Sequence, residues 1–300
     1  MFKKILVVTD FSPNSLKVMS PALALAARFD GTVYLRHVDE EEEALSNHSS
    51  QDLVDFLVHV ESKRSLWLES LANEVREQDI SCEIVRLKGW ASKEILEYSM
   101  EEGMDLTCIS ALGGQGFKSL LMGSTSSNVL RNAKQPILFV SANCSPPDST
   151  VVKTVLYPTD FSEVSLRGTV FVAALCEQLG ASLELYHVMK IPAFIPALPG
   201  EPPLVLPSSL LEKMDVKFED LLAGLEGLIA ADRVTCEVAT AGDEAEAIAA
   251  AAVSKKADLI VIPRRGHGVL AELVFGRVAE SVAKLAPIPT LIFHPDDVEE

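Results

Sequence analysis

This sequence is poor in positively charged residues and has no long hydrophobic run. Its 300 residues hold 26 lysines and arginines against 43 aspartates and glutamates, a formal net charge of −17. Such a balance disfavours binding to DNA, RNA or anionic membranes. The apolar run Ile5–Val8 is too short for the core of a signal peptide, and no apolar stretch approaches a membrane span. We therefore expect a cytoplasmic protein that binds neither nucleic acid nor membrane.

The five cysteines form no metal-binding or redox pattern. No two are spaced as Cys-x-x-Cys, and no Cys/His cluster has the spacing of zinc ligands. Cys108 sits within an apolar run and is expected to be a small core residue. We predict no metal site built by the protein alone and no redox role for a cysteine.

The sequence does contain an internal repeat, the feature that most constrains its architecture. The segment 9–12, Thr-Asp-Phe-Ser, recurs as 159–162, and the pair His-Val at 37–38 recurs at 187–188, both at an offset of 150. Later anchors recur at an offset of 153, among them Gly113 with Gly266, Gly123 with Gly276 and Pro136 with Pro289. Residues 142–150 are rich in Ser, Pro, Asn and Asp, as linkers are. We predict two domains, 1–142 and 151–297.

Each copy alternates short β-branched apolar runs with segments of helical periodicity. In the first copy the pattern predicts strands over 4–8, 32–35, 80–87, 106–110 and 136–141, and helices over 15–29, 52–78, 91–102 and 125–133. Short apolar strands that alternate with helices are typical of a parallel sheet covered on both faces. The predicted fold class is therefore α/β, with two doubly wound five-stranded parallel-sheet domains.

The two copies are expected to associate with one another. Identical units in one chain resemble a covalent homodimer, so we expect a pseudo-two-fold relationship between the halves. Their last strands, 137–141 and 290–294, are apolar and would otherwise leave an unpaired edge, which makes them the expected contact. Self-association of whole chains into dimers is a further expectation.

A ligand site is predicted where strand order reverses, outside the carboxyl ends of the parallel strands. Thr9 and Asp10 follow the first strand, Val38 the second, and a glycine-rich stretch over 110–124 the fourth. Glycine lets a backbone N–H approach a phosphate, and a helix start offers free N–H groups and a positive dipole end. We expect Ser124 to be the N-cap of the following helix and to offer its hydroxyl.

This stretch resembles the ATP-binding signature of the universal stress protein family, Gly-x-x-Gly, nine residues, then Gly-Ser/Thr. Gly113, Gly123 and Ser124 match it, and Ser110 stands at the first glycine. The resemblance covers both copies and implies an adenine nucleotide α-hydrolase-like fold and a binding or regulatory role in stress responses. The ATP contacts that it implies in the first copy are Thr9, Asp10, Val38, Ser110, Gly113, Gly123, Ser124 and Thr125. Mg²⁺ would enter only with the nucleotide.

The second copy departs from the signature. Its counterpart residues are Asp160, Val188, Gly266, Gly276 and Arg277. Pro263 takes the first glycine position and lacks an N–H, and Arg277 replaces the small hydroxyl residue. We expect this second site to be degenerate. Arg264, Arg265, His267 and Arg277 form either a solvated basic loop, the favoured interpretation, or an anion site.

Several alternatives stay open at this point. The chain could be a nucleotide-free interaction scaffold with both sites vestigial, or a slow ATPase, although no nucleophile–base pair and no catalytic residue can be assigned. Asp10 and Asp160 could cap helices rather than contact ligand, and His37 and His187 are expected to make structural hydrogen bonds rather than act as acid or base. The acidic run 40–43 is expected to face solvent. The proline-rich segment 191–207 could cover the second cleft or meet a partner.

Overall fold

The computed structural model describes residues 1–39, 51–111, 122–145, 151–191, 207–264 and 275–297. The predictions for the acidic run 40–43, for Gly113, Arg265, Gly266 and His267, and for the interior of the proline-rich segment lie outside these ranges. The chain divides into two compact units, Met1–Leu138 and Phe139–Glu300, which are described in turn.

The sheet of unit 1 contains the parallel strands β1 (Lys4–Val8), β2 (Thr32–Asp39), β3 (Cys82–Lys88) and β4 (Leu106–Ser110). Beside β4 lies β5 (Ile137–Val140), and the boundary of the unit, after Leu138, falls within this strand. Their spatial order is β3-β2-β1-β4-β5, and β1 pairs in parallel with both β2 and β4. All five residues of β4 are buried, as expected for a central strand covered on both faces. Cys108 in β4 has no exposed surface, which confirms its predicted place in the core.

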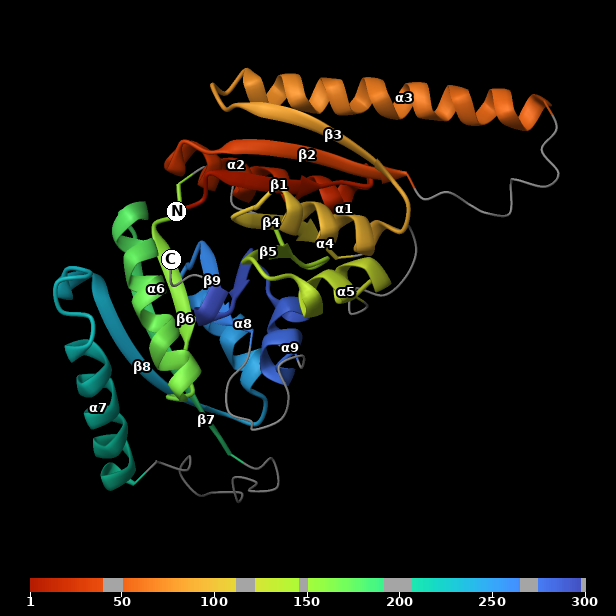
Figure 1. Cartoon of the computed structure of the whole chain (residues 1–300). Helices are drawn as coiled ribbons and strands as arrows, with labels where there is room; N and C mark the ends of the chain where they lie inside the picture. The colour runs from red at the N-terminus through yellow and green to blue at the C-terminus, as the bar shows by residue number, and fades with distance from the viewer. Residues whose placement is uncertain (40–50, 112–121, 146–150, 192–206, 265–274, 298–300) are drawn as a thin grey trace. The chain divides into compact units, whose positions relative to one another are not determined.

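The helices of unit 1 are α1 (Pro13–Leu16), α2 (Met19–Phe29), α3 (Gln51–Arg76), α4 (Ala91–Glu101) and α5 (Ser124–Asn132). In Figure 1, α3 lies along β3 and runs on beyond the end of the strand. α4 and α5 pack against each other, and the Asn128 side-chain amide donates to Ser92 Oγ over 2.9 Å. This contact joins the start of α4 to the middle of α5.

The single helix predicted over 15–29 is wrong, because the structure has two, α1 and α2. Pro21 lies in the first turn of α2, and its ring nitrogen cannot donate to the carbonyl of Lys17 four residues earlier. The second copy has Phe171 at the matching position, and its helix runs unbroken over Glu163–Leu179.

Unit 2 repeats this architecture. Its strands are β6 (Thr154–Pro158), β7 (Ser182–Lys190), β8 (Val234–Ala241), β9 (Leu259–Pro263) and β10 (Thr290–Phe293), in the order β10-β9-β6-β7-β8. Its helices are α6 (Glu163–Leu179), α7 (Ser208–Ala223), α8 (Glu244–Ser254) and α9 (Arg277–Leu285), with short 3₁₀ turns at Ala231–Arg233 and Pro295–Asp297. The predicted class, doubly wound parallel α/β units, is confirmed.

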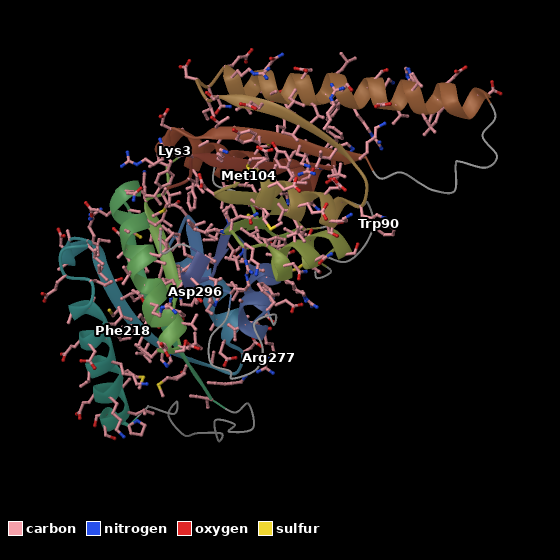
Figure 2. The ribbon with its side chains drawn as sticks, in the orientation of Figure 1. Lys3, Trp90, Met104, Phe218, Arg277 and Asp296 are labelled. Carbon is pink, nitrogen blue, oxygen red and sulfur yellow. The ribbon has the colours of Figure 1, made fainter. Side chains whose placement is uncertain are left out.

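Figure 2 shows the side chains of both units on the ribbon. Two of the labelled residues differ strongly in exposure: Met104 is 4% exposed in the core of unit 1, whereas Trp90 is 81% exposed just before α4. No helix in the described ranges is both long and apolar enough to cross a membrane.

Candidate functional site

Unit 1 has a cleft of about 470 Å³ at the carboxyl ends of its central strands. From β1 the chain passes to its neighbour β2 on one side, and from β4 it passes to its neighbour β5 on the other side. Strand order therefore reverses between β1 and β4. Ligands of doubly wound sheets bind at such a point. The structure brings together here every residue predicted for the first copy within the described ranges: Thr9, Asp10, Val38, Ser110, Gly123, Ser124 and Thr125.

A tight turn after β1 positions Asp10. Phe11 has a left-handed φ of +62°, and the turn is closed by hydrogen bonds from Phe11 N to Thr9 Oγ1 (3.0 Å) and from Ser12 N to Asp10 Oδ1 (2.9 Å). Burial by itself would raise the pKa of Asp10, but hydrogen bonds from Ser12 and Ser15 outweigh it and hold the pKa below its usual value. The cleft therefore presents an ionised carboxylate at neutral pH.

The suggestion that Asp10 caps the next helix is wrong. Ser12 is the N-cap of α1, and its Oγ accepts from Ser15 N over 3.1 Å. Asp10 instead accepts the Ser12 N–H, an arrangement typical of Asx turns. The same pattern recurs in unit 2, where Ser162 caps α6 and Asp160 Oδ1 accepts from Ser162 N over 3.0 Å.

His37 makes a structural hydrogen bond, as predicted. Its Nδ1 lies 2.9 Å from the carbonyl oxygen of Thr9, which can only accept, so Nδ1 carries the proton. Its ring also packs 4.6 Å from that of Phe11, measured between centroids. His187 repeats both contacts, at 2.8 Å to Thr159 O and 4.8 Å to Phe161. Each histidine thus ties the second strand of its sheet to the turn after the first.

The far end of the cleft is the start of α5. Gly123 is the N-cap of this helix, with φ −65° and ψ 161°, and Ser124 is its first residue. The prediction that Ser124 is the N-cap is therefore wrong by one position, since Gly123 has the extended backbone that a cap requires and the Ser124 backbone is already helical. Ser126, which the sequence did not single out, lines the cleft and donates from its Oγ to Ser110 O over 2.7 Å.

Arg64 and Ala91 also line this cleft, and sequence reasoning missed both. Arg64 comes from the middle of α3, whose placement over the cleft depends on tertiary packing rather than on a local motif. Ala91 is the first residue of α4 and carries no chemical group that would mark it.

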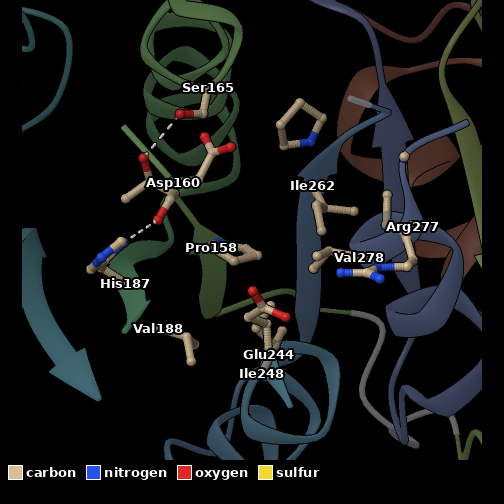
Figure 3. A pocket seen from close by; sticks show the side chains of 14 residues that line it. Pro158, Asp160, Ser165, His187, Val188, Glu244, Ile248, Ile262, Arg277 and Val278 are labelled. Carbon is tan, nitrogen blue, oxygen red and sulfur yellow. Dashed lines mark hydrogen bonds between the residues drawn. The ribbon is translucent and has the colours of Figure 1, made fainter. Parts of the chain in front are cut away.

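Unit 2 has a matching cleft of about 440 Å³, shown in Figure 3. The predicted residues Asp160, Val188, Gly276 and Arg277 all line it. Burial, the largest effect, and the nearby Lys217 ammonium lower the pKa of His187 below its usual value, even though the hydrogen bond to Thr159 O favours the charged ring. At neutral pH this ring is uncharged.

The interpretation of the basic stretch as a solvated loop fails for Arg264, which is only 8% exposed. Its backbone N–H donates to Phe293 O over 2.6 Å, and its carbonyl accepts from Gly276 N over 2.9 Å, so it is tied to the end of the sheet. Arg277 is exposed at the first position of α9 and reaches the cleft. Across the described residues, no three His, Cys, Asp or Glu side chains gather as metal ligands.

Comparison with known proteins identifies the repeat. The model of the universal stress protein family matches the chain twice, over residues 1–141 and 152–294. A universal stress protein of Methanocaldococcus jannaschii is 28% identical over 142 residues, which are 47% of this chain and 82% of that protein. One of Thermus aquaticus is 32% identical over 143 residues, 47% of this chain and 97% of its own.

A solved structure matches nearly the whole chain. A universal stress protein from Archaeoglobus fulgidus has a TM-score of 0.68 and 22% sequence identity, and the match covers 96% of this chain and 95% of that one. At this level of identity the likeness shows the fold, an α/β architecture in two repeated domains.

Proposed function

This chain belongs to the universal stress protein family, and on that premise we propose that it is a binding or regulatory protein of the stress response, located in the cytoplasm, whose first unit binds ATP. The observation that carries the proposal is the make-up of the cleft in unit 1. An ionised Asp10 stands at one end, and at the other end Gly123 opens a helix that begins with Ser124 and Thr125.

The start of α5 suits a phosphate group. Free backbone N–H groups of the first turn and the positive end of the helix dipole favour an anion. Gly123 has no side chain to hold a phosphate away, and the hydroxyls of Ser124 and Thr125 add donors. The Arg64 side chain contributes a positive charge to the same cleft. The opposite end, with Asp10 and Val38, then takes the nucleoside.

The cleft has room for a nucleotide, since ligand pockets commonly measure about 300–1,000 Å³. Mg²⁺ would arrive with the nucleotide, which supplies the phosphate oxygens that this ion prefers. We propose that unit 2 does not bind ATP, because Pro263 removes a backbone donor and Arg277, Val278 and Ala279 replace the hydroxyl residues.

The test is to release and identify what the purified protein carries. The chain is purified without added nucleotide and denatured, and the compounds left in the supernatant are separated by anion exchange. ATP at about one molecule per chain supports the proposal. Empty protein that also fails to bind ATP in a titration would instead support a scaffold with vestigial sites, and turnover of ATP would support an enzyme.

Tryptophan fluorescence locates the binding within the chain. The sequence has two tryptophans, and both lie in unit 1. Trp67 packs edge-on against Phe11, with ring centroids 6.1 Å apart, and Trp90 immediately precedes the cleft residue Ala91. ATP bound in unit 1 should change this fluorescence, whereas a ligand confined to unit 2 should not.

A further inference from the structure

The clefts of the two units share most of their lining residues at one end, although Pro158 of unit 2 stands where unit 1 has Val8. Seven lining positions, which lie on or just after the first, second and fourth strands of each unit and on its covering helices, hold the same residue in both units. They are Thr9/Thr159, Asp10/Asp160, Ser15/Ser165, His37/His187, Val38/Val188, Ile95/Ile248 and Ile109/Ile262. The hydrogen bond between the histidine and the threonine carbonyl is also repeated. A group that contacts these seven residues in unit 1 has the same contacts available in unit 2.

At the other end of the cleft the lining residues differ in chemical character between the units. Hydroxyl and small residues in unit 1 become a proline, a cation, apolar residues and an acid in unit 2. The pairs are Ser110/Pro263, Ser124/Arg277, Thr125/Val278, Ser126/Ala279 and Ala91/Glu244. These substitutions remove the donors that suit a chain of phosphates and add one charge of each sign.

Glu244 and Arg277 stand at the starts of two packed helices. Glu244 is the first residue of α8 and Arg277 the first of α9, and these helices contact each other. Figure 3 shows the Glu244 side chain rising from α8 into the pocket and the Arg277 side chain reaching into it from α9. Glu244 Oε2 already holds a cation, since Lys190 Nζ lies 3.1 Å away. The Glu244 side chain is 27% exposed, so water and ligand reach it.

We infer that the cleft of unit 2 binds an adenosine whose 5′ substituent is a zwitterionic α-amino-acid group instead of a polyphosphate. The amino-acid carboxylate pairs with the Arg277 guanidinium, whose planar fork suits a carboxylate. The ammonium takes the place of Lys190 Nζ, whose side chain is half exposed, as the partner of Glu244. A polyphosphate is disfavoured because Pro263 removes a backbone donor and because Val278 and Ala279 stand where unit 1 has hydroxyl donors. The adenosine half of this inference rests on the proposed function of unit 1.

The probe is S-adenosylhomocysteine, compared with adenosine, AMP and ATP by titration calorimetry. The full chain carries Gly123→Arg, which blocks unit 1. We expect S-adenosylhomocysteine to bind at one molecule per chain, about tenfold or more tighter than adenosine, because two charge-assisted hydrogen-bonding contacts are added. ATP should bind most weakly. Tryptophan fluorescence should not change, since both tryptophans lie in unit 1.

Two variants that restore the residues of unit 1 provide the control. Arg277→Ser and Glu244→Ala should each weaken binding of S-adenosylhomocysteine about tenfold and leave adenosine binding unchanged. Circular dichroism melts check that both variants remain folded. The inference is overturned if S-adenosylhomocysteine binds no tighter than adenosine, if AMP binds tighter than either, or if nothing binds.

Failure of the inference can be separated from failure of the proposed function. ATP binding to unit 1 is measured in the matching variant Gly276→Arg, in which unit 2 is blocked. Loss of ATP binding there with S-adenosylhomocysteine binding intact contradicts the proposed function alone. The reverse result contradicts the inference alone, and a chain that binds no adenosine compound contradicts both.

Discussion

The guanidinium of Arg36 lies 4.7 Å above the ring centroid of Tyr98 and is fully buried beneath α4. One of its nitrogens, Nη2, donates to Glu94 O over 2.8 Å, whereas Nε and Nη1 have no hydrogen-bond partner among the residues that the structure describes. Burial lowers the pKa of Arg36 to about 10. The second copy has Tyr186 at this position, so the fold itself does not require a cation there.

Replacing Arg36 by methionine should therefore stabilise the protein. An unsatisfied buried donor costs about 1–3 kcal/mol, and methionine fills similar space without donors. Arg36→Ala should destabilise, because it leaves a cavity. Urea melts of the two variants and wild type make the comparison. Equal destabilisation by both substitutions would mean that the contacts with Tyr98 and Glu94 outweigh the two missing hydrogen bonds.

His187 should make the stability of unit 2 depend on pH. Its folded-state pKa is lowered, chiefly by burial, so the unfolded chain binds the proton more readily. Stability is then full above pH 6.5, the usual value, and falls as the pH drops from there toward the folded-state pKa.

His187→Asn isolates this contribution, because the asparagine amide can still donate to Thr159 O but does not titrate. Melting temperatures from pH 5 to 8 should fall less steeply at the acid end for the variant. Parallel curves would exclude His187 as the titrating group.

A helix N-cap that unit 2 has and unit 1 lacks should stabilise unit 1 when it is introduced there. Asp243 caps α8 by accepting from Glu246 N over 3.0 Å, whereas Trp90, its counterpart before α4, makes no capping hydrogen bond and is 81% exposed. Trp90→Asp should raise stability by about 1 kcal/mol, and Asp243→Ala should lower it by a similar amount. Thermal melts of both variants provide the measurement, and a loss of stability in Trp90→Asp would show that the indole packs favourably despite its exposure.

Ser124 separates ligand binding from helix stability. Since Gly123 is the cap, Ser124→Ala should leave the melting temperature without ligand nearly unchanged, and alanine favours helices slightly. If the hydroxyl donates to a phosphate, the dissociation constant for ATP should rise about ten- to a hundredfold. Melts with and without ATP reveal both effects. An ATP-induced shift as large as that of wild type would mean that Ser124 does not touch the nucleotide.

Much of this architecture could be predicted from the repeat. The order of strands and helices and the meeting of Asp10, Val38 and Gly123 in one cleft follow from periodicity and from the rule for parallel sheets. The repeat made short sequence patterns informative, because each predicted strand or helix of one copy could be compared with its counterpart in the other copy.

Details that depend on side-chain competition or on tertiary placement could not be predicted. Asp10 and Ser12 are both good N-caps, and only the left-handed Phe11 between them decides that Ser12 serves. Arg64 reaches the cleft through the placement of a long helix. Pro21 breaks the first helix, a signal that was present in the sequence and outweighed the apolar spacing around it.

The most direct test of ATP binding in unit 1 is calorimetric stoichiometry in a matched pair of variants. Gly123 and Gly276 both cap helices and both have φ near −65°, so neither backbone conformation requires glycine. Wild type and Gly276→Arg should bind one ATP per chain, and Gly123→Arg should bind none, with only a modest loss of stability at the helix start. ATP binding that survives Gly123→Arg and disappears in Gly276→Arg would contradict the assignment of ATP to unit 1.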